Sequence, residues 1–213
     1  MAYMDIVKHY EECFKAYGDN NKGVDWPNES DVQARYKVML DVVNFDSRRS
    51  WEGRTPSLLD FGCGLGHLFQ YIQDNHVNVG YEGLDASEIF INKCKQKFPM
   101  SKFYHCDLLS DDPENVVPNY DYIVMNGVFT EKLTMSYEDM LAYFQKLVIK
   151  VYEKCNCGIA FNVMSKDVAW ERDDLFHLPL NVLSKFIVQD LTRDFIIRND
   201  YGLYEYTVYI YKR

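Results

Sequence analysis

The sequence predicts an α/β fold in which a largely parallel β-sheet is packed between helices. From Leu58 onward, short apolar segments alternate with longer segments whose apolar residues recur every three or four positions, the pattern of repeated strand–helix–strand units. Three of the apolar segments end in an aspartate, and alternating glycines follow the first. Near the end of the chain, two strand-like runs flank Asp200-Tyr201-Gly202, which predicts a strand–turn–strand unit. With 213 residues and a hydrophobic content of 47%, the chain suits one compact domain.

The first 56 residues predict two helices. In residues 3–17, apolar and aromatic side chains are spaced by three or four positions, which indicates an amphipathic helix. Residues 18–27 form a polar break that contains Trp26. We expect a second helix to begin after Ser30, with Ser30 as its N-cap.

The remaining elements follow from the alternation of the two patterns. The segment 158–164 is almost continuously apolar, as strands buried on both faces are. Ser87 precedes a helical pattern and is placed to cap it. Strands are predicted at 58–60, 81–85, 103–107, 120–127, 158–164, 195–199 and 205–212, and helices at 68–75, 88–98, 137–154 and 180–191.

The turn after the first of these strands is rich in glycine. It reads Asp60-Phe61-Gly62-Cys63-Gly64-Leu65-Gly66-His67. Alternating glycines let the backbone turn through positive φ and let a ligand approach closely, because no Cβ stands in the way. The dinucleotide fingerprint G-x-G-x-x-G would need a third glycine at position 67, where this chain has His67. The spacing therefore indicates a nucleotide-like ligand other than a nicotinamide dinucleotide.

This D-x-G-x-G-x-G run resembles motif I of the class I S-adenosylmethionine-dependent methyltransferases. The likeness continues in Asp85, which ends the second strand 25 residues after Asp60, and in Asp107, which ends the third. An acid at the end of the second strand can bond both hydroxyls of a ribose. In the family, the acid after the third strand receives the adenine amino group. The resemblance covers residues 57–213 and implies S-adenosylmethionine as cofactor, S-adenosylhomocysteine as product and methyl transfer as the activity.

The same resemblance implies a more detailed architecture. The family fold is a Rossmann-like three-layer sandwich with a mostly parallel seven-stranded sheet and a reversed last strand. Residues 57–213 would form the S-adenosylmethionine-binding methyltransferase domain. Residues 1–56 would form an N-terminal helical cover over the mouth of the cofactor site, within one compact domain.

The family pattern also assigns individual cofactor contacts. Asp60 would reach the ammonium of the methionine part, and Asn126 would lie beneath the sulfonium. Trp26 would close over the cofactor, or is a core aromatic residue, and Arg35 would bind the methionine carboxylate, or is a solvated helix arginine. The predicted cofactor-binding residues are Asp60, Gly62, Cys63, Gly64, Gly66, Asp85, Ala86, Asp107, Leu108, Asn126, Trp26 and Arg35.

The residues after the fourth strand bear on the acceptor. Family members that methylate exocyclic amines often carry N-P-P-Y or D-P-P-Y there, whereas this chain has Asn126-Gly127-Val128-Phe129. This departure favours oxygen over nitrogen as the acceptor atom. His177, in the loop after the fifth strand, is the candidate general base because its ordinary pKa suits the task; the alternative is a loop histidine held by structural hydrogen bonds. The segments 161–165 and 198–207 are similar to a bacterial subgroup associated with surface polysaccharides, which implies a small-molecule or glycan-precursor acceptor.

Composition excludes several classes of partner. A net charge of −9 disfavours nucleic acid, because affinity for polyanions depends on Lys and Arg neutralising phosphates. No apolar run approaches the roughly 20 residues that span a bilayer, and the first residues lack the pattern of an export signal, so we expect a cytoplasmic protein. The six cysteines offer no four-ligand zinc pattern, and Asp121 lies too early in its strand to join Asn126 in a catechol-type metal site, so we predict no metal.

Two other functions stay open at this point. A nicotinamide-dependent oxidoreductase would need the missing glycine and a parallel final strand. A non-catalytic relative would bind the cofactor or a partner chain without transferring a methyl group.

Overall fold

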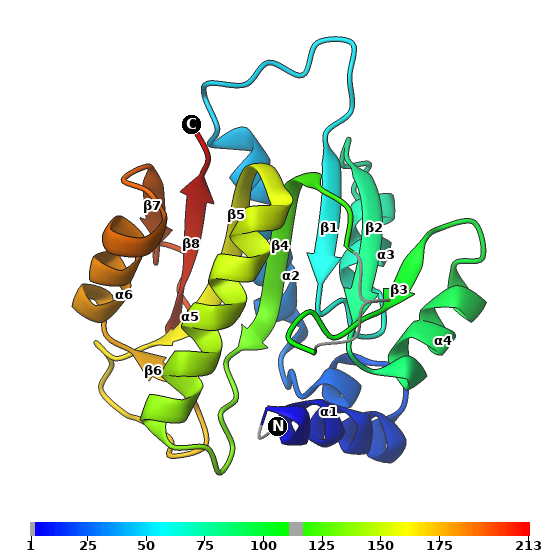
Figure 1. The fold of residues 1–213 in the computed structure, drawn as a ribbon. Helices are drawn as coiled ribbons and strands as arrows, with labels where there is room; N and C mark the ends of the chain where they lie inside the picture. The colour runs from blue at the N-terminus through cyan, green and yellow to red at the C-terminus, as the bar shows by residue number, and fades with distance from the viewer. Residues whose placement is uncertain (1–2, 111–116) are drawn as a thin grey trace.

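The computed structural model describes residues 3–110 and 117–213, which form a three-layer α/β/α sandwich (Figure 1). Seven strands follow the order β3-β2-β1-β4-β5-β8-β7, and the short β6 pairs with β5 outside that path. The strands are β1 (Ser57–Phe61), β2 (Gly80–Asp85), β3 (Phe103–His105), β4 (Tyr120–Phe129), β5 (Cys155–Ser165), β6 (His177–Leu178), β7 (Phe195–Arg198) and β8 (Glu205–Tyr211).

The direction of the strands confirms the predicted sheet. The pairs β2–β3, β1–β2, β1–β4 and β4–β5 are parallel, whereas β8 runs antiparallel to both of its neighbours, β5 and β7. The chain therefore has the mostly parallel seven-stranded path and the reversed last strand. The pattern analysis did not include β6, which has two residues and is too short to show a period.

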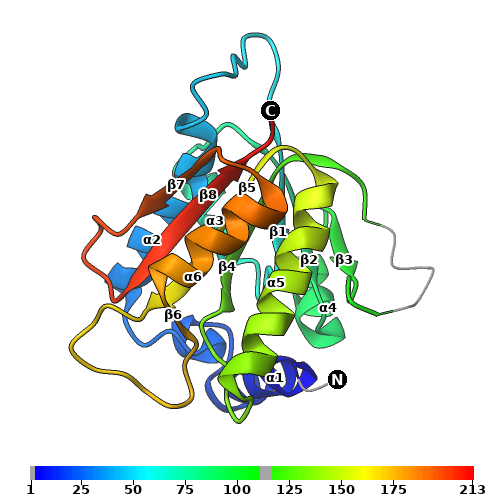
Figure 2. The same cartoon turned by 60° about the vertical axis from the view of Figure 1, so that its left-hand side comes forward.

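Helices cover both faces of this sheet (Figure 2). They are α1 (Met4–Tyr17), α2 (Glu29–Asn44), α3 (His67–Asp74), α4 (Glu88–Lys97), α5 (Tyr137–Lys154) and α6 (Leu180–Phe186); a 3-10 helix, η1 (Asn21–Val24), follows α1, and a π-helical turn, η2 (Ile187–Leu191), continues α6. Alternate residues of a strand point to opposite faces, so Leu58, Tyr122 and Val124 join one apolar cluster and their neighbours join another. The first cluster packs under α2, α3 and α4, and the second packs under α5 and α6.

The N-terminal region divides into two parts. Helix α1 lies across the carboxyl ends of the strands (Figure 1), where Tyr3 and Ile6 join the cluster under α5. Helix α2 instead packs on the face of β4, β5 and β8. Helix α2 nevertheless contributes Tyr36 to the cavity at this end of the sheet. The expectation that residues 1–56 form a helical cover over the mouth of the site stays a prediction.

Several boundaries differ from the predicted ones for local reasons. Helix α2 begins at Glu29 with Asn28 at its N-cap, so Ser30 lies inside the helix and does not cap it. Ser87 caps α4 as predicted, because its hydroxyl oxygen accepts the Phe90 N–H at 3.3 Å. Strand β5 begins three residues earlier than expected, since Cys155 pairs with Tyr120 of β4.

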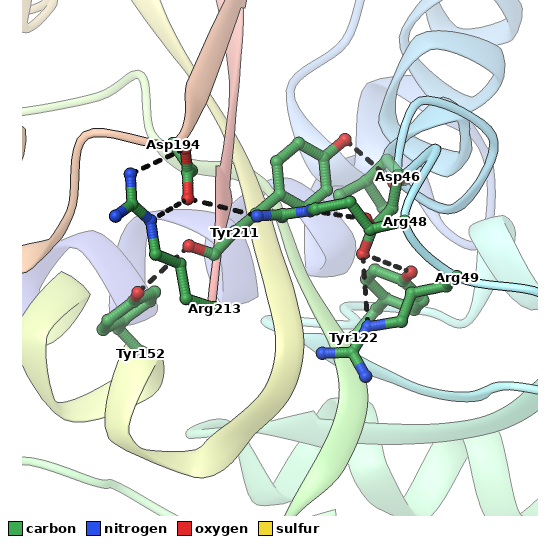
Figure 3. A network of polar contacts seen from close by, with 9 residues as sticks. Asp46, Arg48, Arg49, Tyr122, Tyr152, Asp194, Tyr211 and Arg213 are labelled. Atoms are coloured by element: carbon green, nitrogen blue, oxygen red, sulfur yellow. Dashed lines mark hydrogen bonds and ion pairs between the residues drawn. The ribbon is translucent and has the colours of Figure 1, made fainter.

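A polar network fixes the opposite end of the sheet (Figure 3). Asp46, which is 3% exposed, accepts a hydrogen bond from the Tyr122 hydroxyl at 3.0 Å and one from Arg48 Nε at 3.3 Å. Arg48 also donates a hydrogen bond to Asp194, and Asp194 accepts a second one from Arg213 Nε at 2.6 Å. These contacts join the segment after α2 to β4 and to the last residue of the chain. No described helix combines the length and the apolar character needed to cross a membrane.

Candidate functional site

The glycine turn after β1 forms one wall of a cavity. Gly62 has a φ of +79°, and a Cβ there would stand 2.7 Å from Val128 Cγ2. Gly66 has a φ of +73°, but the space beside it is filled by Phe98, whose Cε2 would lie 2.9 Å from an added Cβ. Gly62 is therefore required because its main chain faces the cavity. Gly66 is required because α3 begins there, directly against the Phe98 ring.

Asp85, at the end of β2, holds this turn in place. Its Oδ2 accepts the Gly64 N–H at 2.8 Å, and its Oδ1 accepts the Ser87 N–H at 2.8 Å. Burial raises the pKa of Asp85 to about 6, although these two hydrogen bonds act in the opposite direction. The carboxylate thus both shapes the loop and lines the cavity.

Asp60 lies deeper, at the end of β1. It is 2% exposed, and its Oδ2 accepts a hydrogen bond from the Tyr81 hydroxyl at 2.8 Å. Burial raises the pKa of this carboxyl to about 7, and the negative charge of Asp85 contributes to the same shift. A cationic group bound in the cavity would favour the ionised form of both acids.

Asp107 follows β3 and connects to α1. Its Oδ2 accepts the Tyr3 hydroxyl at 2.7 Å, and its Oδ1 accepts the Leu109 N–H at 3.0 Å. The Tyr3 ring stacks on Tyr143 of α5 with a centroid distance of 4.9 Å. A second contact, from the Ser87 hydroxyl to Glu11 at 2.6 Å, fixes α1 to the start of α4.

These groups line one cavity of about 1100 Å³, a volume that includes its open mouth. It lies at the carboxyl ends of the parallel strands, where α/β sheets bind ligands. The cavity brings together ten of the predicted residues: Asp60, Gly62, Cys63, Gly64, Asp85, Ala86, Asp107, Leu108, Asn126 and Trp26. Gly66, Arg35 and His177 are not among the residues that line it.

Asn126 contributes an oxygen that has no partner within the protein. Its side-chain Oδ1 is buried and accepts no hydrogen bond from any described residue. Buried polar atoms in native proteins are nearly always paired, so an unpaired one in a cavity wall indicates a ligand or an ordered water. The glycine turn, three carboxylates and this oxygen together fit the ammonium, ribose and base of a nucleoside with an amino acid attached.

Comparison with known proteins places this geometry in a family. A family model described as "Methyltransferase domain" matches residues 59–149, from β1 into α5. A Mycobacterium tuberculosis protein named "Putative methyltransferase Rv1506c" is 24% identical over 158 residues, which are 73% of this chain and 93% of that protein.

Solved structures agree on the fold. The magnesium protoporphyrin IX methyltransferase ChlM of Synechocystis PCC 6803, crystallised with bound S-adenosylmethionine, aligns with a TM-score of 0.63 at 14% identity, over 99% of this chain and 97% of that one. The plantazolicin methyltransferase BpumL, in complex with S-adenosylhomocysteine and a substrate analogue, aligns with a TM-score of 0.59 at 13% identity, over 99% and 98%. The chain is an S-adenosylmethionine-dependent methyltransferase with the class I fold. S-adenosylmethionine is accordingly its cofactor, and S-adenosylhomocysteine the product.

Arg35 of this methyltransferase lies behind the cavity wall. Its Nε donates to both carboxylate oxygens of Glu205, at 3.0 and 2.9 Å, and its guanidinium lies 5.0 Å from the centroid of the Trp26 ring. This placement corrects the expectation that Arg35 binds the methionine carboxylate, and it also differs from the solvated alternative. Its charge is paired with a buried acid and lies against the Trp26 ring, and Arg35 is not among the residues that line the cavity.

A chain of contacts links this ion pair to the cavity floor. Glu205 accepts a hydrogen bond from Asn162 Nδ2 at 3.0 Å, and Asn162 Oδ1 accepts the Gly127 N–H at 2.8 Å. Gly127 has a φ of +80°, and a Cβ there would stand 2.7 Å from Trp26 Cζ2. The contacts therefore close into a ring, which we call the Gly127 ring: Trp26, Arg35, Glu205, Asn162 and Gly127.

His177, in β6, is not among the residues that line the cavity. It is 5% exposed, its Nδ1 lies 2.6 Å from the Ser165 carbonyl oxygen, and its Nε2 accepts the Arg172 N–H at 3.3 Å. Both ring nitrogens are thus engaged within the segment 165–177. This corrects the prediction of His177 as the base and supports the alternative of a histidine that fixes a loop.

Sequence reasoning missed several residues of the site. Tyr3, Tyr10 and Tyr36 line the cavity, and Asn162 supports its floor. The helical spacing of Tyr3 and Tyr10 indicated that they share a face, but spacing alone does not say what the face covers.

Proposed function

We propose that this methyltransferase transfers the methyl group of S-adenosylmethionine to an oxygen atom of a small-molecule or glycan-precursor acceptor. The observation that carries the proposal is the convergence of Asp60, Asp85, Asp107 and the unpaired Asn126 Oδ1 on one cavity. When bound, the cofactor would supply a methyl group on a sulfonium centre. The acceptor oxygen would form a bond to the methyl carbon as the carbon–sulfur bond breaks, S-adenosylhomocysteine would leave, and the hydroxyl proton would pass to solvent.

Each residue has a proposed part in holding the cofactor. Asp60 pairs with the ammonium of the methionine moiety, Asp85 accepts the ribose hydroxyls, and Asp107 with the Leu108 amide meets the adenine edge. The carboxylates suit these parts because charge-assisted hydrogen bonds are about twice as strong as neutral ones. Asn126 Oδ1 accepts a weak hydrogen bond from a carbon-bound hydrogen next to the sulfonium sulfur, which the positive charge polarises.

The acceptor is proposed to enter beside Trp26 and Tyr10, at the end of the cavity away from Asp107. Both rings line the cavity, and the Tyr10 hydroxyl donates to the Gly127 carbonyl oxygen at 3.4 Å. Burial raises the pKa of Tyr10 above its ordinary range, so its hydroxyl stays protonated and cannot serve as a base. With His177 removed from that role, the residues supply mainly alignment, which can give effective molarities on the order of 10⁵ M or more.

Oxygen is preferred over nitrogen because the last four residues of β4 read Asn126-Gly127-Val128-Phe129. The Gly127 N–H in this segment is bound to Asn162, and no proline is present. The net charge of −9 and the three cavity acids favour neutral or cationic acceptors over strongly anionic ones.

Two measurements test the proposal. In calorimetric titrations, S-adenosylhomocysteine should bind and NAD should not; the reverse result would overturn the cofactor assignment. Single-turnover reactions with methyl-labelled cofactor should then be run against neutral sugars, nucleotide-linked sugars, small phenols, small amines and magnesium protoporphyrin IX. Label transferred only to amine nitrogen would overturn the choice of oxygen and leave the cofactor assignment standing.

A further inference from the structure

Outside the cavity, three side chains with metal-binding atoms meet where α1 packs against η1. They are His9 and Cys13 of α1 and Asp25, the residue that ends η1. Each offers one ligand atom, and these atoms all lie within 4.8 Å of one another. None of the three lines the cofactor cavity.

The spacing on α1 presents two of these ligands together. His9 and Cys13 are four residues apart, so their side chains lie on one face of the helix, one turn apart. The Cys13 sulfur is 3.8 Å from His9 Nε2, and Asp25 Oδ2 is 2.9 Å from the same nitrogen. A nitrogen, a sulfur and an oxygen at such separations can be spanned by one ion, with bonds of about 2.0 to 2.3 Å.

The backbone at Asp25 is held in a conformation that non-glycine residues rarely adopt. Its φ is +56°, and its N–H contacts the carbonyl oxygens of Asn21 and Lys22. Asp and Asn adopt positive φ more often than other non-glycine residues do. In this conformation the Asp25 carboxylate points toward α1, with Oδ2 2.9 Å from His9 Nε2.

The surroundings of the three ligands carry excess negative charge. Glu131, two residues after β4, is 8% exposed. It interacts electrostatically with both Asp25 and Cys13, as does Glu12 with Cys13. The nearby cation Arg172 is itself paired with Asp174. A cation bound at the three ligands would offset the negative charge of Glu131 and Asp25.

We propose that His9, Cys13 and Asp25 bind a zinc-like divalent metal ion that fastens α1 to η1. Imidazole and thiolate are the ligands that zinc prefers, and a carboxylate completes a mixed set of three protein ligands. Glu131 lies beside this group and balances the charge of the ion. No local motif indicates this group of residues, because the third proposed ligand comes from a separate turn.

Metal binding here would shape the cofactor cavity without entering it. Tyr10 follows His9 and Trp26 follows Asp25, and both line the cavity wall. An ion that joins the two segments therefore fixes the distance between these two rings. This inference does not depend on which acceptor the enzyme uses.

Cobalt substitution tests the site directly. Full-length protein, free of affinity tags and stripped of metal by a chelator, is titrated with Co²⁺ under reducing conditions and then with Zn²⁺. We expect one equivalent of Co²⁺ to bind with a thiolate-to-cobalt charge-transfer band, which Zn²⁺ abolishes. Cys13→Ser should remove the band, and His9→Gln and Asp25→Asn should each weaken binding at least about tenfold, since even outer-shell changes cost that much.

Controls separate loss of the ligand from loss of the fold. Asn readily adopts positive φ, so Asp25→Asn keeps the turn while removing the charge. His76→Asn, at an exposed position with a φ of +52°, should leave the titration unchanged. Cys13 is also the one cysteine that is not buried. Absence of the band from the wild type, or its persistence in Cys13→Ser protein with native circular dichroism, would overturn the proposal.

Discussion

The Asn162 side chain holds the Gly127 backbone: its Oδ1 accepts the Gly127 N–H at 2.8 Å, while its Nδ2 donates to Glu205. Asn162 is fully buried in β5, so this amide links the sheet core to the cavity floor. The Asn162 amide thereby connects the Arg35–Glu205 ion pair to the residues that line the cavity.

The Arg35–Glu205 ion pair should be strongly coupled. Glu205 is 1% exposed, and Glu205→Gln would leave the Arg35 charge without its partner. We expect a loss of about 3 kcal/mol in the free energy of unfolding, measured by urea denaturation, because breaking a buried pair leaves an uncompensated charge. The double variant Arg35→Gln/Glu205→Gln should lose less than the sum of the single variants. Additive losses would contradict the coupling.

Gly127→Ala should lower the rate of methyl transfer by more than the backbone strain of an alanine at positive φ explains. The added methyl would meet the Trp26 ring at 2.7 Å, so Trp26 must move. Gly202→Ala is a matched control, because Gly202 has a similar φ of +78° with no atom within 4 Å of an added Cβ. Both variants should lose about 1–2 kcal/mol of stability. Only Gly127→Ala should also lower the single-turnover rate of methyl transfer; equal rates in the two variants would remove Trp26 from the site.

Asp85→Asn should weaken binding of S-adenosylhomocysteine by about 1–3 kcal/mol, measured by calorimetry, through lost charge-assisted hydrogen bonds. Asp121 provides the comparison, since it is also a buried acid that accepts a backbone N–H, from Ser57 at 2.9 Å, but it lies at the far end of the sheet. Asp121→Asn should lower stability and leave affinity unchanged. Unchanged affinity in Asp85→Asn would remove Asp85 from the ribose role.

The buried acids predict a pH dependence of cofactor binding. The pKa values of Asp60 and Asp85, about 7 and about 6, lie above the ordinary value, so the folded state binds more protons than the unfolded state between about pH 4 and pH 7. Their contribution to the free energy of unfolding therefore falls as the pH rises through that window. A ligand that carries an ammonium and ribose hydroxyls favours the ionised acids, so binding should strengthen over the same range and release protons.

Calorimetry in buffers of different ionisation enthalpy measures that proton release. Asp60→Asn should reduce the number of protons released near pH 7. Binding that takes up protons, or whose affinity does not change with pH, would contradict the proposed pairing of Asp60 with the cofactor.

The sequence alone predicted the parts of the molecule that local patterns determine. The glycine turn, the end of β2 at Asp85 and the bounds of α5 at Tyr137 and Lys154 were predicted from local patterns, and the structure has them; β1 ends one residue later than predicted, at Phe61. The three acids converge because parallel strands end at the same edge of a sheet. To predict that the three acids lie close together, it was enough to know the strand order, which the family resemblance implied.

The surroundings of Arg35, His177 and Gly66 were not predicted, because they depend on contacts between distant segments. Arg35 and Glu205 are 170 residues apart, and no local pattern indicates that they pair. The orientation of His177 follows from the path of the segment 165–177, which returns its ring to the Ser165 carbonyl oxygen. Gly66 carries the expected positive φ, but its neighbour is Phe98 and not the ligand, a difference that backbone conformation alone cannot show.

The contact between Tyr3 and Asp107 has a practical consequence for handling the protein. A fusion partner attached ahead of Tyr3 would emerge beside the carboxylate proposed to receive adenine, and could obstruct entry of the nucleoside. The last residue, Arg213, is paired with Asp194 at the opposite end of the sheet. A purification handle placed after Arg213 should therefore leave ligand titrations undisturbed.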